Sequence, residues 1–97
     1  LSYDEKAVKK AFKEDTKEVL ENVVRLINPV VDFTTENIQN TIKNWITTNE
    51  IGFGKVMMPL RLALVGALQG PDVFEIIEMI GKEETVSRIE KAIEILL

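Results

Sequence analysis

The sequence of 97 residues contains no cysteine and no histidine. Without cysteine the chain can form neither a disulfide framework nor a thiolate zinc site, which suits a reducing compartment. Without histidine it lacks the commonest general acid and base, the usual nitrogen ligand of metals and every nucleophile that relies on an adjacent imidazole. The carboxylates, such as Asp72 with Glu75 or Glu83 with Glu84, have the spacing of helix caps and helix pairs. We therefore expect no catalytic residue and no metal site in this chain.

Long hydrophobic runs are also missing. No apolar stretch approaches the roughly 18 to 20 uninterrupted residues that a membrane-spanning helix needs. The first residues, Leu1 to Lys6, do not have the layout of a signal peptide. We therefore expect a cytoplasmic protein without membrane contact, and the initial Leu1 in place of methionine predicts a fragment of a larger chain.

The composition that remains is that of a folded domain, with 45% hydrophobic and 29% charged residues. The length predicts a single domain over residues 1–97. The net charge of -4 argues mildly against nucleic-acid binding, because phosphate contacts need lysine and arginine. However, no acidic residue lies between Glu50 and Asp72, where Lys55 and Arg61 do lie, whereas acids outnumber bases from Asp72 to Leu97. Only the first of these regions is suited to face a polyanion.

Apolar residues recur at steps of three and four along the whole chain, and no segment alternates as a strand does. The pattern predicts an all-α fold, a compact bundle of about six short helices. The expected helices cover about residues 4–13, 15–27, 35–48, 55–65, 72–80 and 82–96.

Local signals mark the ends of these helices. Asp15 with Glu18, and Asp72 with Glu75, have the spacing of capping boxes, and Thr34 has the position of an N-cap between the apolar residues of a hydrophobic staple. Pro59 is expected in a first helical turn, where its missing N–H costs nothing. The expected stop signals are Pro29, Gly66 and Gly81, the last in a left-handed C-cap.

The segment from Gly54 to Gly66 is the most informative part of the sequence. It combines a helix start that favours anions with two cations in apolar surroundings, Lys55 and Arg61. The neighbours of Arg61 offer no acid, so its guanidinium is expected to meet solvent or a partner from outside the chain. Recognition of a ligand and a core helix whose arginine reaches water both fit this pattern.

Other residues favour structural interpretations. The methionines, Met57, Met58 and Met79, are expected to fill gaps in the core, and Trp45 belongs to the buried stripe of its helix. The lysine-rich face near the N-terminus is interleaved with acids and is typical of a solvated surface, with contact to an RNA backbone left open. Its members are Lys6, Lys9, Lys10, Lys13 and Lys17.

The residues from Gly54 onward resemble a known family. Gly54-Lys55-Val56-Met57-Met58-Pro59-Leu60-Arg61, then Gly70-Pro71, Phe74-Glu75-Ile76 and Arg88-Ile89-Glu90-Lys91-Ala92, are similar to the C-terminal signature of bacterial glutamyl-tRNA synthetases. The lead-in, Tyr3 to Lys10 and Lys13 to Thr16, is similar but looser, so the resemblance covers essentially the whole chain.

The resemblance implies an all-helical anticodon-binding domain at the end of a class I synthetase. By that likeness Arg61 reads an anticodon base, Gly70 and Pro71 form a turn beside it, and Val73 supplies an apolar contact. Contact of Lys55 with the tRNA backbone is inferred from its charge and its place near a helix start. The implied partners are the glutamate tRNA and the catalytic domains of the same enzyme.

The family's ATP-binding and glutamate-activating motifs are absent from this chain, so we expect it to be non-catalytic. No cofactor is expected in it, and ATP and Mg are those of the parent enzyme. A helical protein-protein interaction module, using the apolar surface from Val56 to Leu64, is the alternative that the sequence leaves open.

Overall fold

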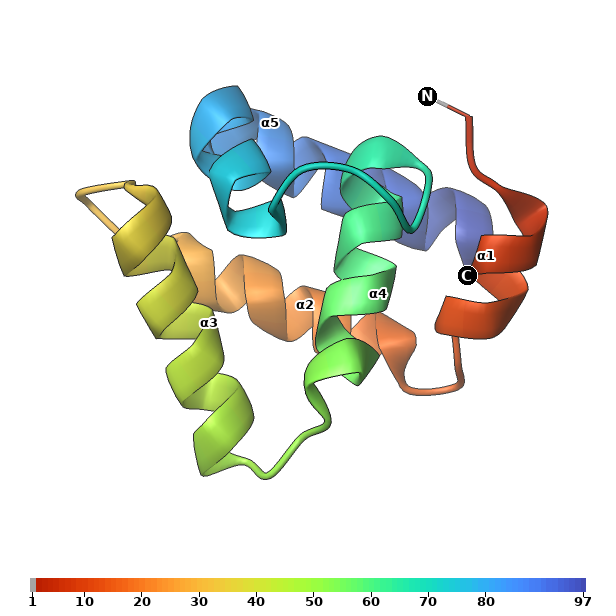
Figure 1. Ribbon diagram of the computed structural model, residues 1–97, viewed down its shortest axis with the longest axis horizontal. Coiled ribbons are helices and arrows are strands. Elements are labelled where there is room, and N and C mark those ends of the chain that lie inside the picture. The colour runs from red at the N-terminus through yellow and green to blue at the C-terminus, as the bar shows by residue number, and fades with distance from the viewer. Residues whose placement is uncertain (1) are drawn as a thin grey trace.

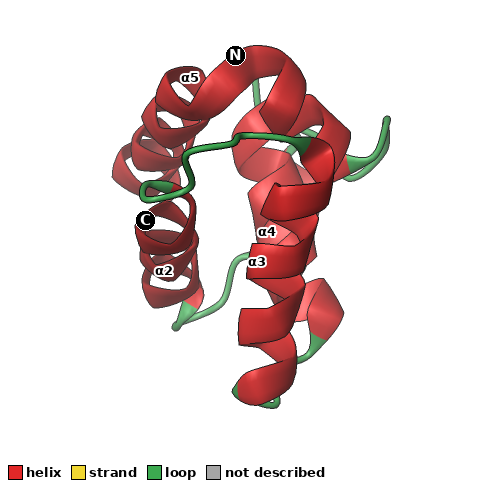
Figure 2. Cartoon of the chain, turned by 90° about the vertical axis from the view of Figure 1, so that its left-hand side faces the viewer, coloured by secondary structure: helices red, strands yellow, loops and turns green. Residues whose placement is uncertain are grey.

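The computed structural model describes residues 2–97 (Figure 1). Within this range the chain forms helices and loops only, without a strand (Figure 2). The helices are α1 (Glu5–Ala11), α2 (Thr16–Ile27), α3 (Thr35–Thr48), α4 (Phe53–Val65) and α5 (Val73–Leu96). The prediction of an all-α bundle is confirmed, although the structure has five helices where about six were expected.

The difference in number comes from Gly81. The last two expected helices continue as one helix, α5, which is broken at Gly81 by a backbone φ of 86° and ψ of 166°. The Thr85 hydroxyl, which is buried, donates to the Gly81 carbonyl four residues earlier at 2.7 Å, so the buried hydroxyl is satisfied within its own helix. The expected glycine of positive φ is therefore present, and the two expected helical segments meet at it as a kinked α5.

Three expected N-cap residues, Asp15, Thr34 and Asp72, stand at helix starts, but only two of them make the expected capping bond. Thr34 accepts a hydrogen bond from the Asn37 N–H, and Asp72 accepts from the N–H groups of Phe74 and Glu75. Asp15 makes no capping bond, because its carboxylate forms an ion pair with Lys55 of α4. An ammonium brought close by the fold has thus taken the carboxylate away from the local N–H groups.

Helix α4 begins earlier than the sequence predicted, at Phe53 with Gly52 as its N-cap. Pro59 therefore lies in the interior of the helix and not in its first turn. In that position it removes one internal hydrogen bond of the helix. The helix ends as expected at Gly66, whose φ of 80° is left-handed and whose N–H donates to Leu62 at 2.8 Å.

Helix α4 lies at the centre of the molecule and packs against α1, α2 and α5 (Figure 1). Val56, Leu60 and Leu64 of this helix are fully buried in the main core. The surface that a protein-interaction module would have used is thus the interior of the domain, which leaves that alternative without its contact face.

The expected core residues are otherwise mostly in place. Met57 is buried, and Met58 and Trp45 are partly buried against the core. Met79 is 75% exposed, so its assignment to the core was wrong. No helix within residues 2–97 has both the length and the hydrophobicity required to cross a lipid bilayer.

Candidate functional site

The loop from Gly66 to Asp72, between α4 and α5, gathers the predicted site residues in one place. Arg61 extends from the last turns of α4, and its Nη1 donates to the Pro71 carbonyl at 2.7 Å. This hydrogen bond spans the loop and holds Pro71 against the helix that precedes it. The prediction that Arg61 would meet only solvent or an external partner is therefore wrong, since the chain supplies a partner of its own.

Gly70 permits this close approach for two physical reasons. Its backbone φ is 139°, a conformation that residues with a Cβ rarely adopt. A Cβ at this position would also lie 3.4 Å from Arg61 Nη1, tighter than an ordinary contact. A glycine at position 70 thus allows both the turn and the position of the guanidinium beside it.

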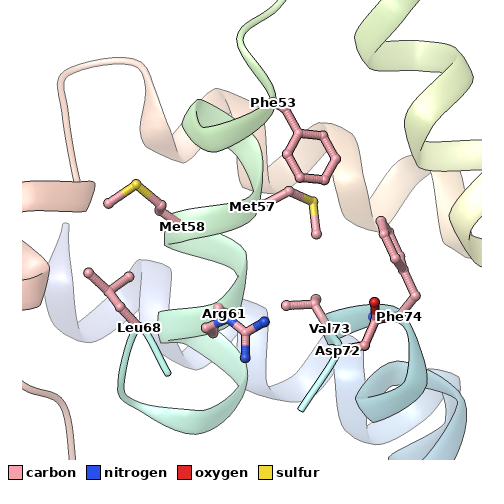
Figure 3. A pocket seen from close by; sticks show the side chains of 8 residues that line it. All are labelled: Phe53, Met57, Met58, Arg61, Leu68, Asp72, Val73 and Phe74. Carbon is pink, nitrogen blue, oxygen red and sulfur yellow. The ribbon is translucent and has the colours of Figure 1, made fainter. Parts of the chain in front are cut away.

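A cavity of about 170 Å³ opens beside Arg61. Figure 3 shows Arg61 and Val73 extending toward the same space from α4 and from the start of α5. The cavity walls are mainly apolar, with Arg61 and Asp72 as the charged residues at their edge. The lining residues are Phe53, Met57, Met58, Arg61, Leu68, Asp72, Val73 and Phe74.

The two charged groups of the cavity differ in how far they are already used. One Asp72 carboxylate oxygen accepts from the N–H groups of Phe74 and Glu75, so it is committed to the start of α5. Arg61 is a planar group with five N–H donors, of which the structure uses one, toward Pro71. Within residues 2–97 Arg61 forms no salt bridge. The cavity therefore offers donors in a fixed plane next to apolar walls.

Comparison with known proteins identifies the family. A model of the anticodon binding domain family matches residues 1–93. The chain belongs to this family. The match covers nearly the whole chain and includes Lys55, Arg61, Gly70, Pro71 and Val73.

Relatives of the domain are glutamate–tRNA ligases. The ligase of Flavobacterium psychrophilum is 56% identical over 95 residues, which cover 98% of this chain and 19% of that protein. The second ligase of a Nitratiruptor species is 42% identical, over 96% of this chain and 20% of that protein. This chain therefore spans about a fifth of the length of the curated relatives that it matches.

A solved structure gives the same result for the fold. The crystal structure of a glutamate tRNA ligase from Elizabethkingia meningosepticum, in complex with its amino acid, is 51% identical and has a TM-score of 0.93. The match covers 99% of this chain and 19% of that one. The five-helix arrangement is therefore also present within a full-length ligase.

The structure places Lys55 apart from the other predicted residues of the anticodon-binding domain. Lys55 does not line the cavity beside Arg61, and its ammonium pairs with the Asp15 carboxylate. The hydrogen bond that the Lys55 ammonium donates to the Asp15 carboxylate lowers the pKa of Asp15 below its ordinary value. Both side chains are nearly half exposed, so the ion pair is open to competition by solvent and by other anions.

Several cavity residues were missed by sequence reasoning. Phe53 was assigned to an exit loop, yet it opens α4, is 50% exposed and lies 5.9 Å from the Lys43 ammonium. A large aromatic residue between two glycines was the available signal, because core aromatics seldom lie in such flexible surroundings. Leu68 and Phe74 carried no such signal, since an apolar residue in a turn or a helix is usually core.

Proposed function

We propose that the cavity beside Arg61 receives an unstacked base of a tRNA anticodon. By this interaction the domain would help a glutamate–tRNA ligase to select its tRNA. The single observation that carries the proposal is a cavity lined by Arg61 and Val73, with Gly70 and Pro71 in contact with the Arg61 guanidinium, in a chain of the anticodon-binding family. The relatives, all named glutamate–tRNA ligase, support glutamate as the amino acid.

The chemistry of the cavity suits a single-stranded base. Proteins read RNA loops by burying unstacked bases against aromatic or apolar side chains and by hydrogen bonding to their edges. Phe53 and Phe74 supply the aromatic walls, and Val73 adds an aliphatic one. The unused N–H groups of Arg61 lie in one plane and can donate to the oxygen and nitrogen acceptors of a base edge.

The bond from Arg61 to Pro71 prepares the site before any ligand arrives. It restricts a long, flexible side chain to one position, so less conformational entropy is lost when a base binds. It also joins the loop to α4, and both walls of the cavity are thereby held together. We propose that Arg61 both shapes the cavity and reads the base.

The remaining steps of tRNA charging belong to other parts of the proposed enzyme. We propose that catalytic domains outside this chain use ATP and Mg to activate glutamate, in the cytoplasm, while this domain contributes the anticodon contact. We also propose that Lys55 contacts an RNA phosphate, which would have to replace Asp15 as its partner.

An NMR titration of the isotopically labelled chain tests the proposal. The titrant is an RNA hairpin with the anticodon loop of glutamate tRNA, and the comparison is a hairpin with a changed anticodon. We expect shifts at Arg61, Gly70 and Val73 that are larger for the glutamate anticodon. Equal shifts with both hairpins, or shifts confined to other helices, would contradict base reading at this cavity.

A further inference from the structure

A second hollow lies beside the cavity of Arg61, between α1 and the loop that follows α4. Its volume is about 380 Å³. We call it the basic hollow, lined by Asp4, Lys6, Ala7, Lys10, Ala67, Leu68 and Gln69. Leu68 lines both the basic hollow and the cavity beside Arg61, so the two spaces share one wall.

Helix α1 is fixed against this loop and does not trail from the domain. The Asp4 N–H donates to the Gly66 carbonyl at 2.9 Å, which joins the start of α1 to the end of α4. Ala7 and Ala11 are buried against Leu62 of α4 in a small apolar cluster. In Figure 1 the loop after α4 descends on the side of that helix that faces α1. The lysines of α1 are therefore held at a set place beside the loop.

Lys6 and Lys10 lie one helical turn apart and face the basic hollow together. Both are exposed, and neither forms a salt bridge within residues 2–97. Like charges four residues apart in a helix repel each other. Glu14, four residues beyond Lys10, lies past the end of α1 at Ala11, where helical geometry no longer brings it back to that lysine. Lys6 and Lys10 thus destabilise the short helix slightly, and no ion pair within residues 2–97 offsets their repulsion.

Asp4 is the acid of the basic hollow, and it is already engaged. Its Oδ1 accepts from the N–H groups of Lys6 and Ala7, as the N-cap of α1. Two lysines against one aspartate leave the hollow with a net positive charge. An anion entering from the loop side would therefore meet two unpaired ammonium groups.

We infer that Lys6 and Lys10 bind backbone phosphates of the RNA strand whose base occupies the cavity beside Arg61. This inference rests on the proposed function. A base inserted into that cavity leaves its flanking phosphates at the rim, and across Leu68 the rim continues into the basic hollow. Phosphate contacts position a strand without reading its sequence, whereas the base contact reads it.

The test compares two double variants and one control in the 97-residue chain. Lys6→Gln with Lys10→Gln removes both charges, and Lys6→Arg with Lys10→Arg retains them. Lys9→Gln removes an equally exposed lysine of α1 that does not line the basic hollow. Fluorescence anisotropy measures the Kd of the glutamate-anticodon hairpin and of a changed-anticodon hairpin at several salt concentrations. Circular dichroism checks that each variant keeps its helices.

For the glutamine double variant we expect the negative slope of log K against log salt to become shallower by about 1.4, the value for two contacts to a single strand. Phosphate contacts contribute little at about 1 M salt, where the variant and the unaltered chain should bind alike. At about 0.15 M salt the difference in slope should make the variant bind roughly tenfold more weakly than the unaltered chain. The ratio of affinities for the two hairpins should not change. The arginine variant and Lys9→Gln should both bind as the unaltered chain does.

The failures of the two proposals are distinguishable. If the glutamine double variant keeps the original slope while the chain still prefers the glutamate anticodon, the phosphate inference is wrong and the proposed function stands. If Lys9→Gln makes the salt slope as shallow as the glutamine double variant does, general surface charge is responsible and the inference is again wrong. If the unaltered chain binds neither hairpin at millimolar RNA, or binds both equally, the proposed function fails and the inference fails with it.

Discussion

Two loops of this domain are each held by a cation on a helix, Lys82 of α5 and Arg61 of α4, and the two cations differ in how many hydrogen-bond donors they keep for a ligand. Each cation also lines a hollow of the surface. The loop after α2 is held by Lys82 of α5, whose Nζ donates to the carbonyls of Asn28, at 2.7 Å, and Val30. The same ammonium lies 5.5 Å from the centre of the Phe33 ring. The loop after α4 is held by Arg61, through its one bond to Pro71.

The difference lies in how many donors remain. A lysine has three N–H groups, and Lys82 directs two of them to carbonyls and its charge to an aromatic face. An arginine has five, and Arg61 uses one while its plane borders an apolar cavity. We conclude that the contacts of Lys82 are structural, whereas those of Arg61 leave capacity for a ligand.

Replacing Arg61 with alanine should have the largest effect on RNA recognition. We expect the preference for a glutamate-anticodon hairpin to fall by roughly 5-fold to 150-fold, the range given by the ~1–3 kcal/mol of a side chain that pairs with a base edge. Arg61→Lys is the matched control, because it keeps the charge and loses the planar fork. It should retain overall affinity better than it retains the preference. An unchanged preference in Arg61→Ala would show that the site lies elsewhere.

Replacing Lys82 with alanine should act on stability and leave recognition intact. The loss of two hydrogen bonds from a charged donor should lower the free energy of unfolding by about 1–2 kcal/mol, measured by urea denaturation. Lys91→Ala, an exposed lysine of the same helix for which no hydrogen bond or salt bridge is recorded, should leave stability almost unchanged. If Lys82→Ala instead abolished the anticodon preference at unchanged stability, the contrast between the two loops would be wrong.

Two glycines near the site should respond to alanine with opposite signs. Gly70→Ala should destabilise the domain by about 1–3 kcal/mol, because its φ of 139° is strained for alanine and the new Cβ crowds Arg61. Gly54→Ala lies within α4 and meets only Met58 Sδ at 3.8 Å, so it should stabilise by about 0.5–1 kcal/mol. Thermal denaturation of both variants measures the difference. Equal melting temperatures would indicate that the loop relaxes without strain.

The smallest expected effect is on the pH dependence of stability, through the contact of Glu78 in α5 with the start of α3. The Glu78 carboxylate accepts a hydrogen bond from the Thr35 N–H at the start of α3, which lowers the pKa of Glu78 below its ordinary value of 4.5. A carboxyl group with a lowered pKa is protonated more readily in the unfolded chain than in the folded one. Its stabilising contribution is therefore present above about pH 4.5 and is lost as the pH falls through the folded pKa.

The variant Glu78→Gln removes this contribution. Its urea midpoint should fall less steeply on acidification than that of the unaltered chain, with Glu83→Gln as a control on the same helix. A parallel decline in all three proteins would exclude Glu78 as a source of the pH dependence.

Local chemistry explains how much of the fold the sequence could predict. The caps at Thr34 and Asp72 join groups within three residues of each other, so their spacing is visible in the sequence. Left-handed glycine at positions 66 and 81 follows from the steric cost of a Cβ. The start of α4 was misplaced because Gly52 and Gly54, which seemed to mark a loop, lie at and just inside the first turn of the helix.

The candidate site was predictable only in part. The resemblance supplied Arg61, Gly70, Pro71 and Val73, and the structure brings all four together, but their direct role in reading a base stays a prediction. The groups that bind the two cations within the chain were not predicted. Arg61 donates to the Pro71 carbonyl, and Lys55 pairs with the Asp15 carboxylate.

The all-helical pattern and most helix boundaries follow from the sequence alone, because each depends on chemistry within a few positions, whereas the residues proposed to contact RNA came from the resemblance. The packing of the helices then sets which charges are neutralised, which apolar residues line a cavity and how many donors each cation keeps. These properties arise from groups that are 10 to 54 residues apart, as in the bonds from Arg61 to Pro71 and from Lys82 to Asn28. Such pairs meet only after the helices pack, since the burial of apolar surface, and not the attraction of the two polar groups, brings them together.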